Sequence, residues 1–354
     1  MVFPANMLAP LKVLIAGLLL SFLSGCTTLN SAVNCDSRTC LLERQKNHQV
    51  RQIDFWQPIL KHPLEQRMLA APVELVDYIS LDNRLNGFPD GIRSAQDSDE
   101  FVILVREALS GLPTAVHELF YNKLAGVFIV DGLGSTGFSD NIYDKTRKPI
   151  AGFIVLDAGY LQKKANAWAS WKDSTTFKPD AKYEIRTTIE TAENDSEVNA
   201  VQFILLHELA HILAIGSRFH PNWNLAQAVN LDDYPFTQFS WELTADKQGY
   251  RSRFDDVFPL RESIVFYRQP KLDAAQLTSV LQTIEQTNFI SLYATNSMFD
   301  DFAESFAIYV HSEMMGKPYR VEVLKSGQPV YALDSCFHSR CRDKYEFFNQ
   351  LFEH

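Results

Sequence analysis

Apolar residues recur every three or four positions along several stretches of the 354-residue chain, the spacing that places them on one face of an α-helix. Ser98 before one such stretch and Gly111 after it are typical of the two ends of a helix. The run "FSWELTADKQGYRSRF", residues 239–254, has the same spacing and is also expected to be helical. The other helices are expected at 63–81, 98–113, 197–216, 272–287, 298–314 and 342–352.

Between residues 125 and 161 the apolar residues form short runs that end in glycine and aspartate. The runs "AGVFIVDGLGSTGFSD" and "KPIAGFIVLDAGYL" favour strands and predict a small sheet. Residues 319–333 predict a hairpin, and the polar stretch 172–197 predicts a loop with one weak strand. No linker rich in glycine or proline divides residues 60–354, so we expect a single α+β domain.

The first 25 residues have the pattern of a signal peptide. An apolar run from Leu11 to Leu23 is too short to span a membrane comfortably and ends in "LSGC". This ending resembles a bacterial lipobox, which implies cleavage before Cys26, a lipid such as palmitate on that cysteine, and membrane anchoring. Thr27, where an aspartate would favour the inner membrane, implies the outer membrane, facing the periplasm. The alternative is an ordinary signal peptide with a chance cysteine.

Four further cysteines form two similar pairs, Cys35 with Cys40 and Cys336 with Cys341. An even set of cysteines in an oxidising compartment predicts disulfides. The spacing leaves open whether each pair closes its own loop or the two ends of the chain are joined. A second zinc site, built from these thiols and His338, is the alternative.

The segment "HELAH", residues 207–211, places three costly polar side chains in an otherwise apolar helix. His207 and His211 are four residues apart, so both imidazoles lie on one face and can bind one zinc ion. Glu208 stands beside them and is placed to take a proton from a water molecule that the metal acidifies. The alternative is a pair of packed histidines with Glu208 hydrogen-bonded to them, which leaves a buried carboxylate without a cation.

A catalytic zinc needs a third protein ligand, and two later stretches offer one. Asp300 is followed one helical turn later by Glu304, and Glu242 is followed in the same way by Asp246. In either case the first carboxylate would bind the metal. The second would accept a hydrogen bond from a ligand histidine and fix its tautomer.

These stretches resemble two branches of the zincin metallopeptidases. HELAH followed by "ELTAD" resembles the gluzincins, such as thermolysin and the prenyl-processing endopeptidases. The stretch from Tyr293 to Glu304 resembles more fully the branch of the lethal factor toxin protease and certain zinc-binding peptidases of bacterial envelopes. That resemblance covers about residues 195–315. It implies that Asp300 is the third zinc ligand, Glu304 its supporting carboxylate and Tyr293 a catalytic tyrosine.

One departure from that branch affects the ligand assignment. The family has glutamate where this chain has Asp300, which is one methylene shorter. Either the helix approaches the metal more closely, or Asp301 or Glu242 takes the role.

We therefore expect a signal peptide at 1–25, a tether at 26–50 and a zincin-like catalytic domain at 51–354. The expected function is zinc-dependent hydrolysis of peptide bonds, in peptides or proteins, in the bacterial envelope. A formal net charge of −10 argues against nucleic acid as a partner. The alternatives are a zinc hydrolase of cell-wall peptide amides and a non-catalytic, zinc-containing binding protein.

Overall fold

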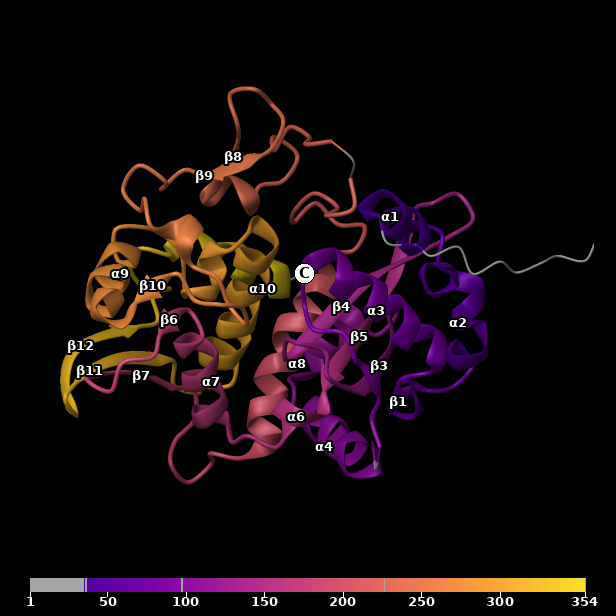
Figure 1. The fold of residues 1–354 in the computed structure, drawn as a ribbon, viewed down its shortest axis with the longest axis horizontal. Helices are drawn as coiled ribbons and strands as arrows, with labels where there is room; N and C mark the ends of the chain where they lie inside the picture. The colour runs from indigo at the N-terminus through magenta and orange to yellow at the C-terminus, as the bar shows by residue number, and fades with distance from the viewer. Residues whose placement is uncertain (1–34, 36, 97, 226, 354) are drawn as a thin grey trace, which may run out of the picture. The chain divides into compact units, whose positions relative to one another are not determined.

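A five-stranded mixed sheet lies beside the helix that carries HELAH (Figure 1). Its path runs β1-β3-β5-β4, and β2 pairs with β3. The pairs β1–β3 and β3–β5 are parallel, whereas β4 runs antiparallel to β5 and forms an edge of the sheet. The predicted sheet between residues 125 and 161 is therefore confirmed. The strands are β1 (Met68–Ala70), β2 (Arg93–Ser94), β3 (Leu124–Asp131), β4 (Gly137–Tyr143) and β5 (Pro149–Asp157).

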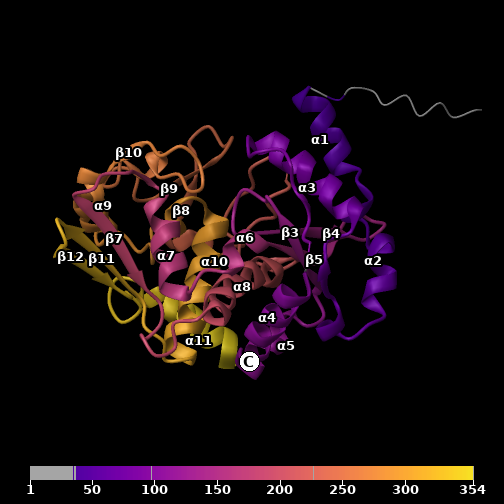
Figure 2. The ribbon, with the colours of Figure 1, turned by 60° about the horizontal axis from the view of Figure 1, so that its bottom comes forward.

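Helices cover both faces of this sheet, and successive residues of β3 pack into two different apolar cores. Val127 and Ile129 belong to the core built with α4, α5 and α8, whereas Phe128 and Val130 belong to the core built with α2 and α3. Figure 2 shows α4 beside α8. A strand covered on both faces is a continuous apolar run, as β3 is. These helices are α2 (Ile53–Leu60), α3 (Val73–Asn86), α4 (Ser98–Ser110), α5 (Thr114–Phe120), α6 (Ala158–Leu161) and α8 (Glu197–Ala214).

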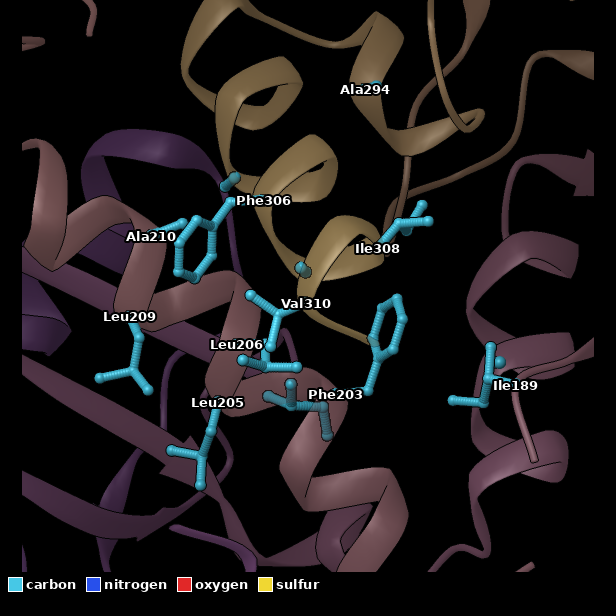
Figure 3. Close-up of a cluster of buried hydrophobic side chains, with 14 of the residues drawn as sticks. Ile189, Phe203, Leu205, Leu206, Leu209, Ala210, Ala294, Phe306, Ile308 and Val310 are labelled. Carbon is cyan, nitrogen blue, oxygen red and sulfur yellow. The ribbon is translucent and has the colours of Figure 1, made fainter. Parts of the chain in front are cut away.

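In the second half of the chain, α10 (Met298–Tyr309) packs against α8 through apolar side chains. Figure 3 shows Ala210 of α8 near Phe306, and Leu206 near Val310. This packing fixes the distance between the two helices that carry the predicted site residues. The remaining helices are α7 (Ala165–Ser174), α9 (Leu277–Ile284) and α11 (Arg342–Glu353), and Val310–Met314 continues α10 as a π-helix.

Three smaller sheets complete the fold. The predicted hairpin at 319–333 is confirmed, and it pairs with β7, the strand expected within the polar stretch. The order of this sheet is β12-β11-β7, and the pairs β10–β6 and β8–β9 stand apart. The strands are β6 (Phe177–Lys178), β7 (Tyr183–Thr188), β8 (Trp241–Leu243), β9 (Tyr250–Ser252), β10 (Leu272–Asp273), β11 (Arg320–Lys325) and β12 (Gln328–Asp334). The mixed α+β class is as predicted.

The helix expected at 239–254 was a wrong prediction, because these residues form the hairpin of β8 and β9. Side chains in the turn bond to each other and to the main chain. The Thr244 hydroxyl donates to Asp246 and accepts from Gly249 N, and Lys247 has a positive φ of 57°. Such local bonds compete with a helix. The stretch 63–81 likewise divides into β1 and α3, which begins after Pro72.

The predicted tether at 26–50 ends earlier than expected. Residues Arg38–Lys46 form helix α1, which packs against α3. Gln45 donates to Asp82 at 2.7 Å, and Arg38 donates to the Leu85 carbonyl at 2.9 Å. These contacts place α1 within the folded unit.

Both cysteine pairs lie at disulfide distance. Cys336 and Cys341 form a disulfide that closes a small loop, and Cys35 and Cys40 are also disulfide-bonded. The Cys336–Cys341 pair therefore closes its own loop, one of the arrangements that the sequence left open. Disulfide-bonded cysteines offer no thiolate to a metal, so this structure does not support a second zinc site on them.

The computed structural model describes residues 35, 37–96, 98–225 and 227–353. The chain divides into the units Met1–Asp36 and Ser37–His354. The predicted signal peptide and the lipidation site Cys26 lie outside the described residues. Within the described residues, no helix is both long and apolar enough to cross a bilayer.

Candidate metal centre

The HELAH residues lie in the C-terminal half of α8, a helix held on most sides by apolar neighbours. Ser196 begins the helix by accepting a hydrogen bond from Asn199 N at 3.3 Å. The side chains of His207 and His211 remain 12% and 13% exposed, whereas most of their neighbours are buried. The apolar residues thus anchor the helix, and the two imidazoles point into one cavity.

Asp300 lies in the first turn of α10, where a carboxylate is favoured by the helix dipole. Ser297 precedes the helix and accepts a hydrogen bond from Asp300 N at 3.1 Å. The Ser297 hydroxyl also donates to Oδ2 of Asp300 at 2.7 Å. This pair of bonds holds the carboxylate so that Oδ1 faces the imidazoles of α8.

Three ligand atoms converge between α8 and α10. Nε2 of His207 lies 3.2 Å from Nε2 of His211, and Oδ1 of Asp300 lies 3.8 Å and 3.9 Å from these two nitrogens. Ligands ~2.1 Å from one ion at tetrahedral angles would lie ~3.4 Å apart. The spacing therefore fits one zinc ion with three protein ligands and an open fourth position. Among the residues that the structure describes, these three form the one such cluster found.

Glu304 lies behind His207, one helical turn after Asp300. Its Oε1 is 3.0 Å from Nδ1 of His207, and Ser291 donates to its Oε2 at 2.7 Å. Burial opposes the charge on Glu304, but Lys172 and His207 lower the pKa of this carboxyl to about 2. A carboxylate only accepts, so Nδ1 of His207 carries the proton, and Nε2 is the nitrogen that faces His211 and Asp300.

Lys172 of α7 is a buried cation next to Glu304. Its Nζ lies 3.6 Å from Glu304 Oε2 and 3.3 Å from Asp173 Oδ1, and 5.1 Å from the ring centroid of Tyr293. Burial disfavours the ammonium, yet the two carboxylates raise the pKa of Lys172 above its ordinary value. Lys172 thus balances the charge of the carboxylate that orients a candidate metal ligand.

Replacing Lys172 with methionine is expected to weaken zinc binding about 10–100-fold, the usual effect of losing a partner behind a metal ligand. Unfolding free energy should also fall by roughly 3–5 kcal/mol, because buried carboxylates lose their counter-charge. Zinc affinity is measured by competition with a chelator, and stability by denaturant unfolding. Lys344, buried and paired with Asp301, provides the matched control. Lys344→Met should lose stability but keep zinc affinity, and unchanged zinc affinity in folded Lys172→Met would contradict the assignment.

Glu208 is 7% exposed and lies directly against the edge strand β4. A Cβ atom added to Gly137 would lie 2.9 Å from the carboxyl carbon of Glu208, so only glycine allows this approach. Burial raises the pKa of Glu208, while His207 and a hydrogen bond from Ser139 act in the opposite direction. A carboxylate of raised pKa beside the ligand atoms is suited to proton transfer.

The substitution Gly137→Ala should displace Glu208 without touching the ligands. We expect hydrolytic kcat/KM to fall by about tenfold or more, since small shifts of reacting groups have effects of this size. Zinc affinity should stay within about threefold of the wild type, because the ligand set is intact. Gly249→Ala is the control, since an added Cβ there meets nothing within 4 Å. Equal kcat/KM in Gly137→Ala and Gly249→Ala would show that the contact between Gly137 and Glu208 has no effect on catalysis.

Tyr293 begins a short 3₁₀ turn before α10 and lies next to His207. The ring centroid of Tyr293 lies 5.3 Å from that of His207 and 4.7 Å from that of Phe266. Burial, followed by the charge of Asp300, raises the pKa of Tyr293 well above its usual range. The phenol is therefore a hydrogen-bond donor at neutral pH.

The ligand atoms and Glu208 open into one cavity of about 340 Å³. Its walls come from β4 on one side, from α1 and α3 on another, and from the segment around Trp223. The residues that line it are Gln45, Asp82, Asn86, Gly137, Phe138, Ser139, Asp140, His207, Glu208, His211, Trp223, Asn224, Tyr293, Ser297, Phe299 and Asp300.

The alternative ligands lie elsewhere. Glu242 is on β8 and pairs with Arg251 at 2.6 Å, and Asp246 accepts hydrogen bonds within its own turn. Asp301 is fully buried and bonded to Lys344 and Trp241. Of the competing carboxylates, only Asp300 faces both imidazoles.

Sequence reasoning missed Lys172 and Gly137. Lys172 stands at the start of the stretch that was predicted to be a polar loop, and nothing local indicated a partner 132 positions away on α10. Gly137 follows a glycine-rich turn, and its need for a bare Cα depends on Glu208, which is distant in sequence.

No protein-family model, curated protein or solved structure matches this chain. The arguments about its function therefore depend on the geometry described above and on the motifs in its sequence.

Proposed function

We propose that the chain is a zinc-dependent metallopeptidase with a zincin-like catalytic domain. The observation that carries the proposal is the convergence of His207, His211 and Asp300 beside a buried Glu208. The edge strand β4 next to the helix that bears HELAH supports it as well, because the unpaired part of a strand edge can bind an extended peptide. The resemblance of residues 293–304 to the lethal-factor-like branch is consistent with this assignment.

A zinc ion held by these three ligands would act as a Lewis acid on a substrate carbonyl and would acidify a water molecule toward neutral pH. The side chains around the ion would have the other catalytic and positioning roles. Glu208 accepts the proton of the attacking water and passes it to the amine that leaves. Tyr293 donates a hydrogen bond to the oxygen on which negative charge develops. Glu304 and Lys172 keep His207 in the required tautomer.

Hydrolysis of a peptide library by the zinc-loaded protein tests this function. We expect cleavage that stops when a chelator removes the metal and returns when zinc is added back. A folded, zinc-loaded protein that cleaves no peptide would favour the non-catalytic binding protein. Cleavage restricted to amide bonds of cell-wall peptides would favour the alternative hydrolase.

The proposed location is the bacterial envelope, with a lipid on Cys26 anchoring the protein to the outer membrane. The lipobox-like ending of the first apolar run supports the anchor, and the disulfide-bonded cysteines suit an oxidising compartment. Labelling with a fatty-acid analogue tests it: the wild type should incorporate the label and Cys26→Ser should not.

A further inference from the structure

The strand β4 has one edge paired with β5 and another that faces away from the sheet. Asp157 N donates a hydrogen bond to the Thr136 carbonyl. This bond fixes which residues of β4 direct their main-chain N–H and C=O groups toward β5. Hydrogen bonds alternate along an antiparallel pair. The main-chain groups of Gly137, Ser139 and Asn141 therefore point to the outer edge, where a substrate strand would pair.

The end of this outer edge at Tyr143 is already occupied. Gln52, just before α2, forms a parallel bridge with Tyr143. Arg51 adds a hydrogen bond to the Tyr143 hydroxyl at 2.8 Å. No substrate backbone can pair at this position while the bridge is present.

The next outward residue, Asn141, is covered by the segment 222–224. Asn141 donates from its side chain to Asn222 Oδ1 at 3.3 Å and is only 2% exposed. Trp223 Nε1 and Asn224 Nδ2 each lie 3.2 Å from Oδ1 of Asp140. Asn141 N also bonds to this Oδ1, at 2.7 Å. The main chain at 140–141 is thus enclosed by the chain's own side chains.

The opposite end of β4 is closed by a loop that contains Tyr267. The Tyr267 hydroxyl lies 3.3 Å from Thr136 Oγ1, and the residue has a φ of 60°, which is strained for a bulky side chain. Ser135 donates to the Gly137 carbonyl at 2.9 Å. At this end, too, fewer main-chain groups can pair with a substrate than at an uncovered strand edge.

Among the contacts of the described residues, none covers Ser139 or the N–H of Gly137 on the outer edge, and both residues line the cavity with Glu208 and the ligand atoms. This inference rests on the proposed peptidase function. We propose that the site binds short peptides or the ends of longer chains, in which at most two residues on one side of the cleaved bond pair with β4. A strand rises ~3.3 Å per residue, so two residues fill the span from Gly137 to Ser139. Both Gly137 and Ser139 line the cavity of about 340 Å³ that holds the ligand atoms.

A length series tests this inference. All peptides in the series contain the same cleavable pair of residues. One set is extended stepwise on the N-terminal side of this pair and the other on its C-terminal side, up to a length of about ten residues. In one of the two sets kcat/KM should fall by about tenfold or more beyond the second residue, because the extension meets Asn141 and Gln52. Decapeptides cleaved as well as tripeptides in both sets would overturn the inference and leave the peptidase function intact.

The variant Asn222→Ala removes one of the contacts that cover β4 and should raise the ratio of kcat/KM for long peptides to that for short ones. Asn230→Ala is the matched control, an exposed asparagine of the same segment that bonds only within its turn among the contacts described. If the ratio of kcat/KM for long peptides to that for short ones is unchanged in both variants, the role of Asn222 is overturned.

Binding of the same peptide series to zinc-loaded Glu208→Gln gives a second readout, independent of turnover. Failure to cleave peptides of any length would overturn the proposed function and this inference together.

Discussion

Replacing Asp300 with alanine is expected to lower zinc affinity by about 100-fold or more, because a three-ligand site would keep only its two imidazoles. The remaining pair, His207 and His211, would hold the ion too weakly to survive dialysis against a chelator. Metal content after dialysis and affinity by chelator competition measure the effect. Circular dichroism should show that the variant remains folded, since the Asp300 side chain is 23% exposed and not part of the core.

Glu242→Ala is the matched control for this ligand assignment. Glu242 belongs to the alternative zincin pattern, but it lies on β8 and pairs with Arg251. Its loss should change zinc affinity by no more than about twofold, as expected for an exposed ion pair. Zinc lost from Glu242→Ala and retained by Asp300→Ala would reverse the assignment.

The substitution Glu208→Gln should lower kcat by about 10³-fold or more while leaving zinc in place, since a positioned general base contributes about 10²–10⁴-fold. Glutamine keeps the shape of the side chain against Gly137 but cannot accept the proton. Peptide hydrolysis and metal content are measured on the same sample.

Substitution of a second buried glutamate, Glu304, distinguishes an effect on metal binding from an effect on proton transfer. Glu304 hydrogen-bonds to His207, so Glu304→Gln should weaken zinc binding about 10–100-fold. Glu208→Gln should not weaken it. Retained turnover in zinc-loaded Glu208→Gln would contradict the role of this residue.

The elements that carry the site were predictable because their signals are local. The helix around HELAH has apolar flanks, a serine at its start and a glycine after its end, and α8 spans Glu197–Ala214, two residues shorter than the expected 197–216. The four-residue spacing of His207 and His211 fixes their common face whatever surrounds them. Helix α10 was predicted from the same kind of local signal, whereas spacing alone did not separate Asp300 and Glu304 from Glu242 and Asp246, and the preference for Asp300 came from the resemblance.

Features that depend on distant contacts were not predictable. The periodicity of residues 239–254 suits a helix, yet the turn bonds of Thr244 and Asp246 and the pairing of β8 with β9 produce a hairpin. The strand order β1-β3-β5-β4 cannot be read from single strands, and it is this order that places β4 at an edge. Lys172 reaches Glu304 because α7 packs against α8, which in turn packs against α10.

The most direct test of the account is the zinc content of the purified, folded chain, measured by elemental analysis beside that of His211→Ala. The account predicts about one zinc per wild-type chain and almost none in the variant, because the site needs both imidazoles. A folded wild-type chain that takes up no zinc, or equal zinc in the two proteins, would contradict it.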